Sequence, residues 1–193
     1  MYEFIKGDIQ SLTPATAIVE TGGIGYLINI SLQTYTKIGE ERRVCLLLHH
    51  VIREDAQLLF GFFDEEERVI FRQLISVTGV GVNTARMILS SLSSSDIAAA
   101  IEKEDVTKLK GVKGIGLKTA QRIIVDLKGK VHEATLAGKL PSTPAGKARE
   151  EAMSALITLG FSRTAVEKVL DSLTSEGLGG SVEELIKQSL KRL

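Results

Sequence analysis

The first third of the chain has the period-two pattern of short β-strands. Tyr26, Ile28 and Ile30, for example, fall on one face of a strand that follows the turn signal Gly22–Gly23. Five such segments are predicted, over residues 4–9, 16–20, 26–31, 42–50 and 57–62. Five short strands in about 60 residues predict a small β-barrel of the oligonucleotide-binding (OB) kind.

From Asp64 onward the hydrophobic period becomes helical, and one pattern occurs twice. Residues 74–92 and 109–127 carry the same apolar, glycine, threonine and alanine positions at an offset of 35 residues. Each copy has a Gly-apolar-Gly triplet directly before an amphipathic helix. The repeat therefore predicts two helix-hairpin-helix units, joined through the cap-rich Ser93–Ser95 and a short helix that ends near Lys103.

The two triplets are candidate phosphate sites. A helix start exposes backbone N–H groups and a partial positive charge, and glycine adds no side chain that would keep an anion away. Gly79 and Gly81 can both take a positive φ, while Val80 between them can turn inward as an apolar anchor. A helical repeat array, in which the glycines serve packing alone, is the alternative, but such arrays need about three repeats.

Local charge favours an anionic partner. The chain as a whole balances 24 basic against 24 acidic residues, yet residues 106–125 contain no Asp or Glu. The basic residues of that stretch are Lys108, Lys110, Lys113, Lys118 and Arg122. A basic stripe on a neutral protein indicates a directed contact with an anion such as DNA.

Two nucleotide-binding motifs are imitated near the second triplet and both are incomplete. The segment 111–119 resembles a phosphate-binding loop, but Leu117 stands where that loop requires lysine. The dinucleotide fingerprint requires a third glycine, and the chain has Thr84 and Thr119 at those positions. Neither nucleotide-binding motif is therefore predicted.

Composition excludes several other classes. The chain is 44% hydrophobic without an apolar run near the ~20 residues of a membrane span, and it begins without a secretory signal, so we expect a cytoplasmic protein. Cys45, the single cysteine, is expected to be buried. His49 and His50 should face opposite sides of a strand, and His132 stands alone. No metal and no cofactor are expected.

The C-terminal part is predicted to be a tethered helical bundle. Residues 129–147 are rich in Gly, Pro, Ser, Thr and Ala, which predicts a flexible linker. Residues 148–193 have three helical segments, interrupted at Gly160 and at the glycines of 177–180. A bundle of this size is more typical of a partner adaptor than of a catalytic domain.

Three segments resemble the RuvA family of proteins that bind four-way (Holliday) DNA junctions. They are residues 53–62 (REDAQLLFGF), residues 114–120 (GIGLKTA) and residues 159–161 (LGF). The resemblance runs the length of the chain and implies an α+β multidomain fold. An OB-like barrel (1–63) would contribute to tetramerisation, a tandem helix-hairpin-helix domain (64–128) would bind DNA, and a linker (129–147) would lead to a UBA-like three-helix bundle (148–193) that binds the motor.

The resemblance also implies site residues. DNA would contact Gly79, Val80, Gly81, Asn83, Gly114, Ile115, Gly116, Lys118, Thr119 and Arg122. Glu54 and Asp55 match an acidic pin, although the two acids by themselves are also typical of a solvated turn. Leu159, Phe161 and Val169 would bind the motor or belong to the bundle's own core. The chain departs from the family at Asn83 and Leu117, where relatives often have lysine.

The function implied is sequence-independent binding of four-way junctions by a homotetramer or octamer. The partners would be the RuvB ATPase, which drives branch migration in recombination and in the repair of DNA damage during the SOS response, and the RuvC resolvase. The chain itself would be non-catalytic. A glycosylase or nuclease is one alternative, and a single-strand binder that uses the barrel is another. The second is poorly equipped, because the chain has no Trp and only 5% aromatic residues.

Overall fold

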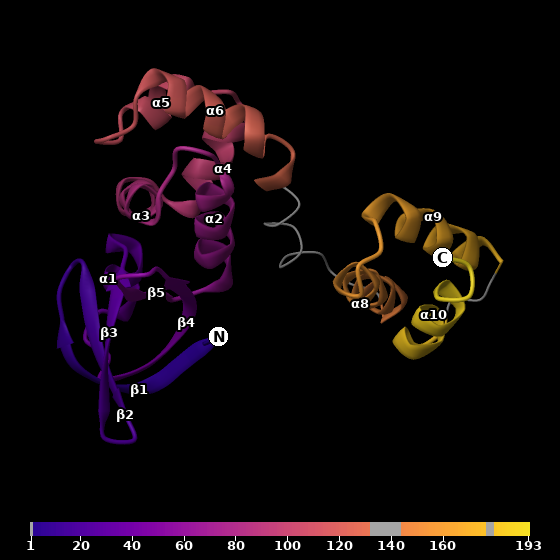
Figure 1. Ribbon diagram of the computed structural model, residues 1–193, viewed down its shortest axis with the longest axis horizontal. Coiled ribbons are helices and arrows are strands. Elements are labelled where there is room, and N and C mark those ends of the chain that lie inside the picture. The colour runs from indigo at the N-terminus through magenta and orange to yellow at the C-terminus, as the bar shows by residue number, and fades with distance from the viewer. Residues whose placement is uncertain (1, 132–143, 177–179) are drawn as a thin grey trace. The chain divides into compact units, whose positions relative to one another are not determined.

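The computed structural model (Figure 1) describes residues 2–131, 144–176 and 180–193. The chain divides into two units, Met1–Lys139 and Leu140–Leu193. Each unit has its own hydrophobic core, so each is described by itself.

The N-terminal unit begins with a closed five-stranded barrel. Its strands are β1 (Phe4–Leu12), β2 (Thr16–Thr21), β3 (Ile24–Ile30), β4 (Arg43–Ile52) and β5 (Gln57–Phe62). They follow the order β1-β2-β3-β5-β4, with β3 and β5 parallel and the other neighbours antiparallel. All five predicted strands are confirmed, and most of them extend beyond the predicted limits.

One helix of the barrel was not predicted. Helix α1 (Leu32–Ile38) connects β3 to β4, and the side chain of Ser31 accepts a hydrogen bond from the Thr34 N–H at its start. The helix ends at Gly39, whose φ is 56°. The β-prone composition of this segment, TYT, hides the helix. The serine cap and the terminal glycine were the signals that could have revealed it.

The prediction for Cys45 was wrong. Val44, Leu46 and Leu48 point into the barrel, so Cys45, between two of them, lies on the outer face and is exposed. The apolar run therefore concealed ordinary strand alternation. The adjacent histidines do point in opposite directions: the His49 ring lies 5.4 Å from that of Phe71, and the His50 ring lies 5.2 Å from that of Tyr2.

The helical part of this unit contains both predicted hairpins. Its helices are α2 (Glu65–Ser76), α3 (Val82–Ser91), α4 (Ser94–Glu102), α5 (Val106–Lys110) and α6 (Leu117–Leu127). Ser93 caps α4 as predicted, and the repeated apolar positions of α3 and α6 are buried. One core runs from Phe60 and Phe62 of the barrel through all five helices. The hairpins are therefore held in a fixed position relative to the barrel.

A buried carboxyl group also joins the barrel to the helices. Glu67 in the first turn of α2 is fully buried, and its two oxygens accept hydrogen bonds from the hydroxyls of Ser31 and Thr34. The Thr34 hydroxyl in turn accepts a bond of 3.1 Å from the Phe63 N–H. Burial raises the pKa of Glu67 above its ordinary value of 4.5, despite these two donors.

Arg68, next to Glu67, forms a second link. Its side chain is 6% exposed and pairs with Glu3 and Glu65. It also donates to the carbonyl of Glu3 at 3.1 Å and to that of Leu48 at 3.4 Å. Two consecutive residues of α2 thus connect that helix to the residue that precedes β1, to β4 and to the start of α1.

The raised pKa of Glu67 predicts a specific pH dependence. The folded state retains the carboxyl proton above pH 4.5, where the unfolded chain has lost it, so the contribution of Glu67 to the free energy of unfolding should fall as the pH rises from 4.5 through the folded pKa. Glu67→Gln cannot ionise and should lack this decline. The three tyrosines, Tyr2, Tyr26 and Tyr35, all belong to the N-terminal unit and no Trp is present, so tyrosine fluorescence in urea titrations at pH 4.5 to 8 reports this unit. Parallel pH profiles for the two proteins would contradict the assignment.

The C-terminal unit is a three-helix bundle, as predicted. Its helices are α8 (Pro144–Thr158), α9 (Arg163–Ser175) and α10 (Val182–Ser189). Its core consists of Ala152, Leu156, Val166, Leu170, Leu173 and Leu185. Most of the predicted linker, residues 132–143, lies outside the described residues. At its C-terminal end the prediction differs from the structure, because α8 already begins at Pro144, where proline suits a first turn.

Candidate nucleic-acid interface

The first hairpin is the turn between α2 and α3. The Val80 N–H donates to the Val77 carbonyl at 3.0 Å, and the Ala85 N–H donates to the Gly81 carbonyl at 2.9 Å. Val80 is 5% exposed and belongs to the shared core. The turn is thus anchored from inside, as predicted, and Thr78, Gly79 and Gly81 are exposed.

The second hairpin, between α5 and α6, repeats this geometry. The Ile115 N–H donates to the Val112 carbonyl at 3.1 Å, and the Ala120 N–H donates to the Gly116 carbonyl at 2.9 Å. Ile115 is 6% exposed. The sequence repeat is therefore a repeat of backbone conformation, including the inward anchor.

The two glycines of each triplet have different roles. Gly79 and Gly114 have φ values of +94° and +89°, which side chains rarely adopt. Gly81 and Gly116, which can also take a positive φ, have φ values of −82° and −84°. A Cβ at either position would have no heavy atom within 4 Å. Neither backbone nor packing requires glycine there, which indicates that the bare surface itself is what matters.

The helix starts behind these glycines are uncapped. No side chain accepts a hydrogen bond from the first turn of α3 or of α6. In α2, α4 and α5, by contrast, the side chains of Asp64, Ser93 and Asp105 do so. The first-turn N–H groups at both hairpins therefore remain available to an external anion, on the positive end of a helix.

The basic stripe is weaker than the sequence indicated. Lys108 pairs with Asp96 at 2.7 Å, and the Arg122 side chain lies 3.6 Å from Asp126 on its own helix. Asp126 directly follows the acid-free stretch on the same helix, whereas Asp96 belongs to α4 and reaches Lys108 through the fold. Among the residues that the structure describes, Lys110, Lys113 and Lys118 have no ion pair, and all three are exposed.

The first hairpin has fewer available cations. Asn83 is exposed but neutral, and the half-buried Thr84 is neutral too. Arg86, one turn later, is hydrogen-bonded to the barrel. The Arg86 guanidinium donates to the Ala15 carbonyl at 3.1 Å and to the Asn29 side-chain oxygen at 3.2 Å. This arginine connects α3 to the barrel. Thr119 in the second hairpin is half-buried.

The acidic pair lies at the tip of the β4–β5 hairpin. The Arg53 N–H donates to the Ala56 carbonyl at 2.8 Å, which closes the turn around Glu54 and Asp55. Both carboxylates are exposed, and neither is ion-paired within the described part of the chain. Among residues 2–131, 144–176 and 180–193 there is no cluster of three His, Cys, Asp or Glu that could hold a metal ion.

The structure separates the three residues predicted to bind a motor. Leu159 is 62% exposed, whereas Phe161 and Val169 are half-buried and pack against the core of the bundle. Gly160 between them has a φ of +102° and ends α8. Ile157, 39% exposed, is a neighbouring apolar residue that the sequence reasoning did not select.

Three family models match the chain. They are the RuvA N terminal domain at residues 1–61, the SAM-like helix-hairpin-helix tandem at residues 71–129, and the RuvA C-terminal domain at residues 147–193. Relatives named "Holliday junction branch migration complex subunit RuvA" match over the full length of both chains. The protein of Parabacteroides distasonis is 49% identical over 196 positions, and that of Bacteroides fragilis is 46% identical over 201. The chain belongs to the RuvA family.

The RuvA family models coincide with the structural parts. The acidic turn lies within the match to the RuvA N terminal domain, and both hairpins lie within the match to the tandem. The three-helix bundle lies within the match to the RuvA C-terminal domain, apart from the first residues of α8. The resemblance stated from the sequence is thereby confirmed. No helix in the described part of the chain is long and apolar enough to cross a membrane.

Proposed function

We propose that this RuvA-family chain binds four-way DNA junctions through the paired glycine hairpins and does so without sequence preference. The observation that carries the proposal is the pair of uncapped helix starts, each behind a glycine that neither backbone nor packing requires. Backbone N–H groups at a helix start suit phosphate oxygens, and phosphate contacts carry no base information. Such a site recognises the course of the DNA backbone.

Glu54 and Asp55 supply the preference for a junction over continuous duplex. Their exposed carboxylates lie on the unit that carries the hairpins and repel phosphates that approach them. In a homotetramer or octamer the pins of neighbouring copies would gather where the four arms meet. Repulsion there disfavours a continuous duplex and favours strands that separate at the crossover.

The C-terminal bundle serves a partner. Its exposed Leu159 and the adjacent Ile157 offer an apolar contact to the RuvB ATPase, with Phe161 and Val169 supporting that surface from the core. The relatives' name, subunit of a branch migration complex, supports this role. In this proposal the chain is the non-catalytic subunit and acts in the cytoplasm on recombining DNA. It also presents the bound junction to the RuvC resolvase.

Electrophoretic comparison of a synthetic four-way junction with linear duplex of the same sequence tests the proposal. We expect tighter binding of the junction, with no change when the base sequence of the arms is altered. Equal affinity for the two DNAs would contradict it. Cleavage of the labelled junction in the presence of Mg²⁺ would contradict the non-catalytic assignment.

The division of labour predicts separable activities. Residues 1–131 contain the barrel, both hairpins and their shared core, so they should bind the junction within about twofold of the full chain. They lack the bundle and should fail to stimulate the ATPase of the motor. Filter binding and an ATPase assay measure the two properties. Full stimulation by residues 1–131 would show that the motor contact lies elsewhere.

A further inference from the structure

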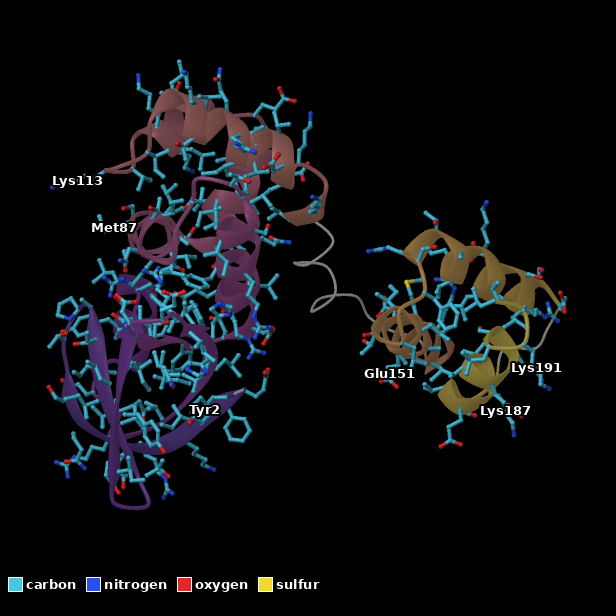
Figure 2. All side chains as sticks on the ribbon, in the orientation of Figure 1. Tyr2, Met87, Lys113, Glu151, Lys187 and Lys191 are labelled. Atoms are coloured by element: carbon cyan, nitrogen blue, oxygen red, sulfur yellow. The ribbon has the colours of Figure 1, made fainter. Side chains whose placement is uncertain are left out.

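The two hairpins have the same backbone but different charges. With the offset of 35 residues, Thr78 in the first turn corresponds to Lys113 in the second, and both are exposed. Each directly precedes the glycine with positive φ. Figure 2 shows Lys113 projecting away from the helices at the turn between α5 and α6.

The difference continues beyond the turns. Asn83 in α3 corresponds to Lys118 in α6. Arg86, the arginine of α3, donates hydrogen bonds to two oxygen atoms of the barrel. The first hairpin therefore has no free cation between Val77 and Leu92, whereas Lys113 and Lys118 flank the second triplet without an ion pair among the described residues.

We propose that the two hairpins hold DNA in physically different ways: the first through backbone amides alone, and the second through amides and lysines. Lys113 is a phosphate contact in its own right, in addition to the residues named above. This inference rests on the proposed function and deepens it, since it assigns the salt dependence of binding to one hairpin. It also explains how the second hairpin can function with the neutral Leu117 at its helix start, because Lys113 supplies a cation from the other side of Gly114.

The two modes respond differently to salt. A lysine that neutralises a phosphate releases a condensed counterion, so the logarithm of the affinity falls by ~0.9 per phosphate for each unit of log salt. An amide carries no net charge and releases no counterion. Most of the salt dependence should therefore come from the second hairpin.

Exchange of the two corresponding residues tests this. Lys113→Thr should reduce the salt slope of junction binding by ~0.9 per bound copy of the chain. Thr78→Lys should increase it by ~0.9 per bound copy, because it places the same cation on the same backbone geometry. The double variant should return to the original slope. Fluorescence anisotropy of a labelled junction, in 50 to 500 mM KCl, provides the slopes.

Lys191→Thr is the matched control, since it removes the same charge from an exposed position after α10. Its slope should equal that of the unchanged chain. An unchanged slope in Lys113→Thr, or an equal loss in Lys191→Thr, would overturn the inference. The proposed function itself is tested separately by Gly116→Asp. Loss of binding there with an unchanged Lys113→Thr slope would refute only the role of Lys113, whereas retained binding would refute the phosphate site of the second hairpin.

Discussion

Replacing Gly116 with aspartate should lower junction affinity by about 100-fold or more while leaving the chain as stable as before. The carboxylate of an aspartate at this position would accept hydrogen bonds from the first-turn N–H groups of α6. It would thereby fill the proposed phosphate site and place a negative charge there. Charge-assisted hydrogen bonds contribute roughly 1.5–3 kcal/mol each, so the loss of two of them already corresponds to this change in affinity.

The free energy of unfolding should stay the same or rise slightly, in contrast to the loss of junction affinity. Gly116 has an extended backbone with φ −84° that any residue can adopt, and open space around its Cβ. Aspartate is among the best N-cap residues and exceeds glycine by a few tenths of a kcal/mol. We therefore expect an unchanged or slightly higher midpoint in thermal unfolding followed by circular dichroism. Gly114→Val, in contrast, would strain a backbone with φ +89° and confuse folding with binding.

The equivalent change in the first hairpin is Gly81→Asp, and Ser181→Asp provides the matched control. Ser181 is the N-cap of α10 in the C-terminal bundle, so this variant adds the same charge to the same kind of position. Gly81→Asp and Gly116→Asp should both lose binding, and Ser181→Asp should retain it. Retained binding in both glycine variants would refute the phosphate site.

Neutralising the acidic pin should have the second largest effect, on selectivity. Glu54→Gln with Asp55→Asn should tighten binding of linear duplex by about tenfold, since it removes two charges that repel phosphate. Binding of the junction should change less, so the preference for it should decline. Competition between labelled junction and unlabelled duplex measures this ratio directly.

A second acidic pair on the same barrel offers the control. Glu40 and Glu41 are adjacent and exposed in the segment between α1 and β4. Glu40→Gln with Glu41→Gln changes the net charge by the same amount and should leave the junction-to-duplex ratio as it was. If both pairs shift the ratio equally, the effect belongs to net charge and the pin has no particular role.

Local sequence patterns predicted most of the fold. Strand alternation, the duplicated glycine triplets and the Ser93 cap each depend on neighbours within a few residues, and all were confirmed. Helix α1 was not predicted because several of its residues favour strands. In the structure, the hydrogen bond from the Thr34 N–H to the Ser31 side chain stabilises the start of the helix. The exposure of Cys45 was missed because an apolar run conceals alternation.

The candidate site was predictable in position but not in charge. The triplets identified both turns, and their valine and isoleucine anchors are buried as expected. Which cations remain free depends on partners distant in sequence: Asp96 pairs with Lys108, and Ala15 and Asn29 hold Arg86. Such pairs arise only when the chain has folded, so no local pattern contains them.

The most direct test of the central claim observes the hairpin amides themselves. The full chain, labelled with ¹⁵N at glycine, should give separate signals for Gly79, Gly81, Gly114 and Gly116, with Gly7 and Gly61 in the barrel as internal references. On titration with junction DNA, we predict that the four hairpin signals shift and that the two barrel signals stay in place. Binding of the junction with no change in the hairpin glycines would contradict the account.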